Sequence, residues 1–156
     1  MILHDENFLP MAFQLIHNAN RSICISTFKA EITHKKRGME LVILFEELIR
    51  KKRQGVDVKF IINYHADQRL IPKTNIYVIN YLKDNDIEVR SLRLKRCNHA
   101  KIVMVDTEQA IIGSHNLSVK SVNNNFEVSY LVKSIVDVCY LQSVFDTVWL
   151  SAKLPF

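Results

Sequence analysis

The sequence has few cysteines and no long apolar run. Its three cysteines, Cys24, Cys97 and Cys139, are odd in number and widely spaced, which argues against a disulfide framework and a Cys-x-x-Cys zinc site. No apolar stretch approaches the roughly 20 residues that a membrane-spanning helix needs. The first residues lack the basic start and unbroken apolar segment of a secretory signal. We therefore expect a soluble, cytoplasmic protein.

Linkers, repeats and low-complexity segments are also absent from the sequence. Hydrophobic residues make up 48% and charged residues 24% of the 156 residues, a composition typical of a folded globular chain. One core in a chain of this length can bury about two thirds of the surface that the unfolded chain exposes. We expect a single domain that spans residues 1–156.

Helical and strand patterns alternate along the chain. Repeated strand–helix–strand units followed by a hairpin predict an α/β fold, with a mixed sheet and helices on both of its faces. The apolar periodicity predicts helices at 11–20, 39–53, 75–83 and 135–150, and strands at 23–28, 56–63, 87–94, 101–106, 110–112 and 126–132.

A dense polar motif lies between positions 99 and 116. It reads His-x-Lys-x4-Asp, with His99, Lys101 and Asp106, followed by Gly-Ser-x-Asn at 113–116. The first part alone should occur by chance in roughly one chain of this length in a hundred, and the second lowers that by about a thousandfold. An imidazole can attack phosphorus, while an ammonium, a hydroxyl and an amide can hold phosphoryl oxygens. The motif therefore indicates phosphodiester chemistry.

Local structure should bring these groups together. Residues 101–106 and 110–112 predict a β-hairpin with a three-residue loop at 107–109. His99 and Lys101 are two residues apart, so they project from the same face of an extended strand. The segment 113–116 would then return beside His99.

The motif resembles that of the phospholipase D superfamily, and the closer likeness is to its single-motif branch of bacterial non-specific endonucleases. Segment 63–72 has no close match in that branch. Elsewhere the likeness covers nearly the whole chain, including the stretches 19–28, 51–62, 126–129 and 145–149.

The resemblance implies roles for individual residues. His99 would form a covalent phosphohistidine, and Glu127, which matches a family glutamate, would orient its imidazole. Lys101 and Asn116 would bind non-bridging phosphate oxygens, and the Ser114 hydroxyl would assist them. No metal and no cofactor is implied. Two motif residues are expected to be structural: Gly113, and Asp106, which lies on the opposite strand face from Lys101.

One histidine is not sufficient for this chemistry, because the leaving alkoxide also needs a proton donor on the opposite side of phosphorus. Longer members of the superfamily carry two copies of the motif, whereas this chain carries one. We therefore predict an isologous homodimer in which the two copies of His99 face each other across a two-fold axis. His115, at the variable position of the motif, is expected at most to line the site.

Charge indicates the substrate class. The net charge is +5 and the isoelectric point is near 9.2, and a basic rim beside a phosphodiester site suits nucleic acid. The candidate rim consists of Lys35, Lys36, Arg37, Arg93, Lys95 and Arg96.

Three functions remain open. The first is a metal-independent nuclease that cleaves DNA or RNA. The second is a phospholipase D-type lipid phosphodiesterase, which the lack of an obvious amphipathic insertion helix disfavours. The third is a non-catalytic nucleic-acid-binding module, which the intact set of His99, Lys101, Asn116 and Glu127 disfavours.

Overall fold

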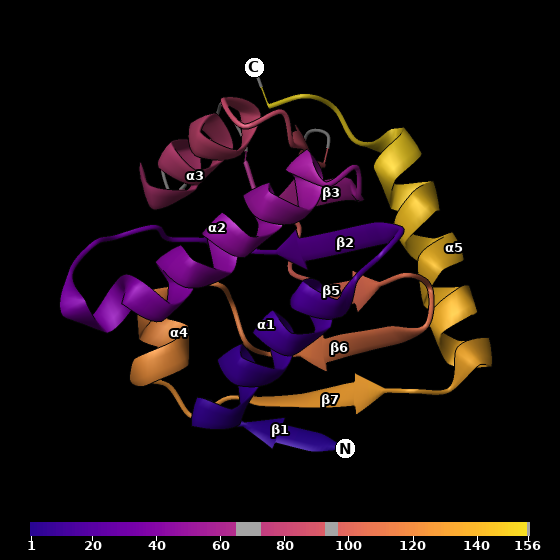
Figure 1. Cartoon of the computed structure of the whole chain (residues 1–156), viewed down its shortest axis with the longest axis horizontal. Helices are drawn as coiled ribbons and strands as arrows, with labels where there is room; N and C mark the ends of the chain where they lie inside the picture. The colour runs from indigo at the N-terminus through magenta and orange to yellow at the C-terminus, as the bar shows by residue number, and fades with distance from the viewer. Residues whose placement is uncertain (65–72, 93–96, 156) are drawn as a thin grey trace.

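Seven strands form one mixed sheet in the computed structural model, which describes residues 1–64, 73–92 and 97–155. The strand order is β1-β7-β6-β5-β2-β3-β4 (Figure 1). The strands are β1 (Ile2–His4), β2 (Ser22–Thr27), β3 (Asp57–Ile62), β4 (Glu88–Arg90), β5 (Ile102–Val105), β6 (Gln109–Gly113) and β7 (Val128–Val132). The helices are α1 (Phe8–Asn18), α2 (Met39–Arg53), α3 (Lys73–Lys83), α4 (Val119–Asn123) and α5 (Ile135–Ser151). Two 3₁₀ turns occupy Asp5–Asn7 and Lys36–Gly38.

The sheet topology places the motif at the centre. Strands β2, β3 and β4 run parallel, and α2 lies between β2 and β3 in the chain. β5 pairs antiparallel with both β2 and β6, and β6 pairs antiparallel with β7. The end of β2, the start of β5, the end of β6 and the start of β7 therefore meet at one end of the sheet.

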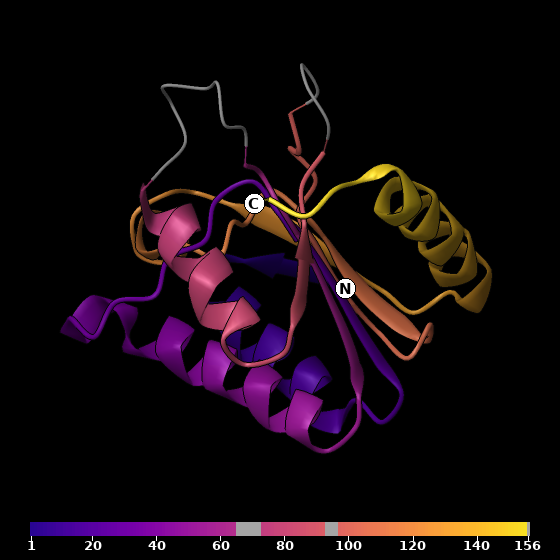
Figure 2. The ribbon, with the colours of Figure 1, turned by 90° about the horizontal axis from the view of Figure 1, so that it is seen from above.

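Helices cover both faces of this sheet, which confirms the predicted fold class. Figure 2 shows α1, α2 and α3 on one face and α5 on the other. The larger hydrophobic core lies under the first three helices, where Phe45 of α2 and Phe60 of β3 have ring centroids 6.2 Å apart. A smaller core holds α5 through Val138, Phe145 and Trp149. Helices α1, α2 and α3 are amphipathic, and each buries its apolar face against the sheet.

Several boundaries differ from those that the sequence predicts. Helix α1 begins at Phe8 rather than at residue 11; Pro10 is tolerated there because the first-turn amides of a helix have no intrahelical partner. The hairpin loop is three residues long, as predicted, but lies at 106–108 rather than 107–109. Strand β1 and helix α4 were not predicted, since segments of three and five residues are too short to show a period. Within the described ranges, no helix is both long and apolar enough to cross a membrane.

Candidate functional site

His99 and Lys101 lie immediately before β5, at the end of the sheet where four strand termini meet. The Lys101 ammonium donates from Nζ to His99 Nδ1 at 2.9 Å and to the His99 carbonyl oxygen at 2.6 Å. Lys101 is only 8% exposed, whereas His99 is exposed to solvent. β5 begins one residue later than predicted, but the two side chains still meet as the sequence predicts.

An aromatic ring adjoins both groups. The Phe28 ring centroid lies 5.2 Å from that of His99, and Lys101 Nζ lies 5.7 Å from the Phe28 centroid. Burial lowers the pKa of Lys101, while the negative charge of Glu127 opposes that shift. The ammonium is thus held in a partly desolvated position, where an electrostatic contact with an anion is stronger than in bulk water.

Asn116 connects the motif to the loop that follows β2. Its side-chain Oδ1 accepts hydrogen bonds from Thr27 Oγ1 at 3.3 Å and from the Lys29 backbone amide at 3.1 Å. Its own backbone amide donates to Ser121 Oγ at 2.8 Å. With the amide oxygen engaged by these donors, the side-chain NH₂ group is the end suited to an anionic oxygen.

Glu127 is connected to Asn116 through Ser121 and is 8% exposed. Its Oε1 accepts hydrogen bonds from Ser121 Oγ at 3.1 Å and from Asn125 Nδ2 at 2.9 Å. Burial would raise the pKa of Glu127, but hydrogen bonds from Ser114, Asn125 and Ser121 outweigh it and hold the pKa below its usual value. Glu127 is therefore an ionised carboxylate near neutral pH.

No hydrogen bond joins Glu127 to His99 among the residues that the structure describes. The carboxylate instead contributes to the electrostatic environment of Lys101. Ser121, which the sequence did not single out, links Asn116 to Glu127. The role of Glu127 as the partner of His99 stays a prediction.

Gly113 and Ser114 hold the end of β6 against β7. A Cβ atom on Gly113 would lie 2.2 Å from Ser129 Oγ and 2.4 Å from Ser129 Cα, so only glycine fits this approach. Ser114 Oγ accepts a hydrogen bond from the Val128 amide at 3.0 Å, and its one hydrogen has two acceptors, the Val128 carbonyl at 3.3 Å and Glu127. The Ser114 hydroxyl therefore joins the end of β6 to the start of β7. Its contact with a substrate phosphate stays a prediction.

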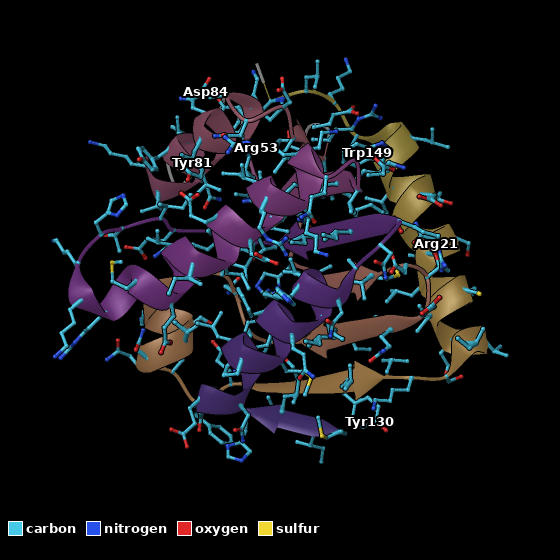
Figure 3. All side chains as sticks on the ribbon, viewed as in Figure 1. Arg21, Arg53, Tyr81, Asp84, Tyr130 and Trp149 are labelled. Carbon is cyan, nitrogen blue, oxygen red and sulfur yellow. The ribbon has the colours of Figure 1, made fainter. Side chains whose placement is uncertain are left out.

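Asp106 lies at the opposite end of β5 from Lys101, outside the site. Its carboxylate accepts hydrogen bonds from the backbone amides of Asn20 at 2.8 Å, Arg21 at 2.7 Å and Ser22 at 2.8 Å. Burial raises the pKa of Asp106, but the hydrogen bonds from these three amides together lower it by more, and the net shift is downward. Figure 3 marks Arg21 near this end of the sheet. The hydrogen bonds fasten the hairpin to the start of β2.

Asn98, which the sequence did not identify, anchors the segment that carries His99. It is 4% exposed, and its Nδ2 donates to the carbonyls of Thr27 at 3.1 Å and Ile61 at 3.3 Å. Its Oδ1 accepts from Ser26 Oγ at 3.1 Å, and its backbone amide donates to Asn63 Oδ1 at 3.2 Å. The residue before His99 is thus tied to the ends of both β2 and β3.

Asn75 on α3 extends this network. Its Nδ2 donates to the carbonyls of Phe28 at 3.0 Å and Asn63 at 2.8 Å, and its Oδ1 accepts from the Ala30 amide at 2.9 Å. Asparagine satisfies unpaired backbone groups at strand ends because its amide both donates and accepts. The sequence did offer one signal for these residues: asparagines that follow or interrupt apolar runs are candidates for hydrogen bonds to unpaired backbone groups at strand ends.

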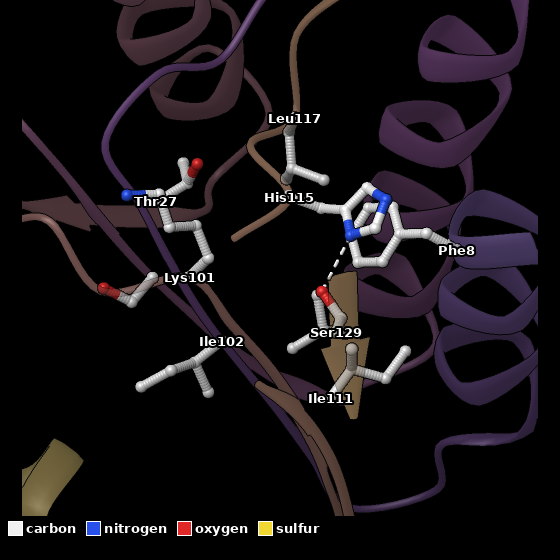
Figure 4. A pocket seen from close by; sticks show the side chains of 10 residues that line it. Phe8, Thr27, Lys101, Ile102, Ile111, His115, Leu117 and Ser129 are labelled. Atoms are coloured by element: carbon white, nitrogen blue, oxygen red, sulfur yellow. Dashed lines mark hydrogen bonds between the residues drawn. The ribbon is translucent and has the colours of Figure 1, made fainter. Parts of the chain in front are cut away.

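His115 is buried at 2% exposure and, together with Lys101, lines a small cavity (Figure 4). Its ring stacks on Phe8 with centroids 4.3 Å apart, and its Nδ1 lies 2.8 Å from Ser129 Oγ. Burial lowers the pKa of His115, and the nearby carboxylates Glu127 and Asp5 oppose the shift. The cavity offers about 10 Å³, roughly the space of one water molecule.

The candidate basic rim is described only in part. Lys35, Lys36 and Arg37 are exposed, and the Arg37 carbonyl accepts a hydrogen bond from Asn123 Nδ2 at 3.0 Å. The other three rim residues, Arg93, Lys95 and Arg96, lie outside the described residues, as does most of the unmatched segment 63–72. In the part of the chain that is described, no three His, Cys, Asp or Glu residues form a group suited to a metal ion.

The sequence is similar to a known protein family and to two relatives within it or close to it in sequence. The model of a family described as "Cardiolipin synthase, PLD-like domain" matches residues 12–149. Cardiolipin synthase B of Salmonella typhi is 28% identical over 89 residues, which are 57% of this chain and 21% of that protein. The 5'-3' exonuclease PLD3 of Xenopus laevis is 25% identical over 175 residues, covering 99% of this chain and 34% of that protein. The chain thus spans about a fifth to a third of the length of these relatives.

The fold has a close structural counterpart. The crystal structure of Nuc from Salmonella typhimurium, a phospholipase D family member, matches with a TM-score of 0.80 at 17% identity. The match covers 98% of this chain and 96% of that chain.

Proposed function

Because the chain belongs to the phospholipase D superfamily, we propose that it is a phosphodiesterase that cleaves nucleic acid, with His99 as the nucleophile. The observation that carries this proposal is the contact between the exposed His99 imidazole and the buried Lys101 ammonium. This arrangement places an imidazole and a desolvated cation close enough to engage the same phosphoryl group once it binds.

The reaction proceeds in two displacements. In the first, an unprotonated nitrogen of His99 attacks phosphorus, a P–N bond forms, and the P–O bond to the leaving group breaks. Lys101 and the NH₂ group of Asn116 stabilise the charge that builds up on the non-bridging oxygens. A second imidazole, in its protonated form, gives its proton to the leaving alkoxide. In the second displacement, the second imidazole, now neutral, takes a proton from the water that attacks phosphorus, the P–N bond breaks, and both histidines return to their starting forms.

The second imidazole comes from a second copy of the chain. An uncovered apolar row on the sheet supports this part of the proposal. Ile2, Tyr130 and Ile112 lie opposite one another on β1, β7 and β6, and the row ends at Ile102, which is partly buried and adjoins Lys101. Ile2 is 67% and Tyr130 is 52% exposed, and Figure 3 marks Tyr130 on the outer strands. Exposed apolar rows of this kind mark interfaces, so we place the subunit contact here.

Nucleic acid is the preferred substrate. The chain carries a net charge of +5, and the basic residues at 35–37 are exposed. A relative that aligns with nearly the whole chain is described as a 5'-3' exonuclease. The second candidate substrate is a lipid phosphodiester. It is supported by the description of the matching family and by the similarity to cardiolipin synthase B.

A substrate panel in the presence of EDTA tests the proposal. The panel contains plasmid, single-stranded DNA, RNA and phospholipid vesicles, and compares the unaltered chain with His99→Ala. His34→Ala, which removes an exposed histidine outside the motif, is the matched control. Nucleic-acid cleavage that His99→Ala abolishes and His34→Ala retains would support the proposal. Headgroup release alone would select the lipid function, and salt-sensitive binding without turnover would identify a non-catalytic module.

Subunit assembly is tested separately by sedimentation. Tyr130→Lys places a charge in the middle of the apolar row and is expected to yield an inactive monomer. Ile43→Lys, at an exposed position on α2, is the control and should leave the dimer intact. An active monomer would refute the shared site.

A further inference from the structure

The Lys101 ammonium already has partners within the chain before any substrate binds. It donates hydrogen bonds to His99 Nδ1 and to the His99 carbonyl oxygen, and it lies 5.7 Å from the centroid of the Phe28 ring. The ring of Phe28 also lies against the imidazole, 5.2 Å from its centroid. Lys101 therefore holds the imidazole that must later attack phosphorus, and the Phe28 ring lies against it.

The direction of the Lys101–His99 bond determines where the imidazole proton lies. An ammonium has three hydrogens and no lone pair, so it can only donate. Nδ1 of His99 must then be the accepting nitrogen, and a neutral imidazole carries its single proton on the other nitrogen, Nε2. In this state one nitrogen is blocked by Lys101 and the other is protonated, so neither has a free lone pair for attack.

We propose that Lys101 locks His99 in an unreactive tautomer in the free chain and that a bound phosphate group releases it. The proposal rests on the proposed function, in which His99 is the nucleophile. Anionic phosphate oxygens are stronger acceptors for a partly buried ammonium than a neutral ring nitrogen, because opposite charges add a Coulombic attraction that a neutral acceptor does not provide. A phosphoryl group in the site therefore draws Nζ away from Nδ1.

Release changes the proton positions without changing the charge of the ring. Nδ1 takes up a proton from water, while Nε2 gives its proton to water and gains a free lone pair. The substrate thus activates its own nucleophile. In the absence of a phosphate group, His99 is protected from other electrophiles even though it is exposed.

Nitrogen NMR of the chain labelled with ¹⁵N-histidine tests the proposal directly. The measurement is made at about pH 8, where an ordinary histidine is neutral, and His99→Gln identifies the resonances of His99. In the free chain we expect the proton on Nε2 and a hydrogen-bonded, unprotonated Nδ1. Inorganic phosphate should shift the proton to Nδ1. A proton on Nδ1 in the free chain, or no change on adding phosphate, would overturn the proposal.

Lys101→Met supplies the second test, because it keeps an apolar stem and removes the ammonium. The response of the His99 resonances to phosphate should be lost in this variant and retained in Lys133→Met, which removes an exposed lysine at the far end of β7. A response that persists in Lys101→Met would refute the lock. These spectra need no turnover, so a chain that switches but cleaves nothing would refute only the proposed function. A chain that cleaves without switching would refute only the lock.

Discussion

Asn98→Ala should both destabilise the protein and impair catalysis, although residue 98 is not expected to touch the substrate. The substitution removes three buried side-chain hydrogen bonds, to Thr27, Ile61 and Ser26. A buried hydrogen bond contributes about 1 kcal/mol net, and an unsatisfied buried group costs about 1–3 kcal/mol. The carbonyl oxygens of Thr27 and Ile61 each have a second lone pair, so the cost per lost hydrogen bond lies near the lower value of about 1 kcal/mol. For three hydrogen bonds we expect the free energy of unfolding to fall by about 3 kcal/mol.

Urea unfolding and thermal melting measure this loss. For a chain of this size each 1 kcal/mol lowers the melting temperature by roughly 2–4 °C, which gives a decrease of roughly 6–12 °C. Asn124→Ala, at an exposed position, is the matched control and should change the stability by less than about 0.5 kcal/mol.

Asn98→Asp sharpens the test because it preserves size and the acceptor for Ser26. It replaces the donating NH₂ with an oxygen that faces the carbonyls of Thr27 and Ile61, so it should be at least as harmful as alanine. At a temperature where the variants remain folded, kcat should fall by more than about tenfold, since even a small displacement of the His99 segment is costly. A stability loss below about 1 kcal/mol for alanine, or a benign aspartate, would refute the assigned network.

Three further outcomes are expected. Gly113→Ala should cost about 3 kcal/mol or more in urea unfolding, because its Cβ would collide with backbone atoms of β7 that cannot move aside; a loss under about 1 kcal/mol would contradict this. Because the pKa of Asp106 is lowered in the folded chain, the ionised Asp106 carboxylate stabilises the fold fully at pH values above the unfolded-state pKa of about 3.9. This stabilisation is lost as the pH falls through the lower pKa of the folded chain. The stability difference between the unaltered chain and Asp106→Asn, measured by unfolding at several pH values, should therefore shrink on acidification, and a constant difference would count against it. Replacing the three basic residues at 35–37 with alanine should weaken DNA binding and reduce the slope of log K against log salt by about 0.9 for each phosphate that these side chains neutralise, whereas an unchanged slope would remove them from the binding surface.

The sequence predicted those parts of the fold that local patterns determine. Helix α2 was predicted with its observed bounds because a clear apolar face is followed by a basic last turn and a glycine. The hairpin of β5 and β6 was recognised because both strands and the loop are contiguous. His99 and Lys101 meet for the same reason, since they are two residues apart.

Contacts between distant segments could not be predicted in this way. The network around Asn98 joins residues 26, 63 and 98, and nothing in a single sequence indicates which strand ends become neighbours. Ser121 was missed for a related reason, because the five-residue helix that presents it has no detectable period. The same limit applies to Glu127, whose family role was predicted but whose hydrogen bonds run to Ser121 and Asn125.

The hydrogen bonds divide the site into a fixed part and an adjustable part. Asn98, Ser121 and Glu127 are buried and bonded to several elements, so they can move only if strand ends move with them. Lys101, by contrast, is held by a histidine from its own short segment, and phosphate can replace that partner without any change in the sheet. Substitutions in the fixed part should therefore lower stability and activity together, whereas Lys101→Met should abolish activity with little loss of stability. The effects on activity and on stability separate because Lys101 bonds only to His99 within its own segment, whereas the buried residues around them are hydrogen-bonded to several elements of the fold.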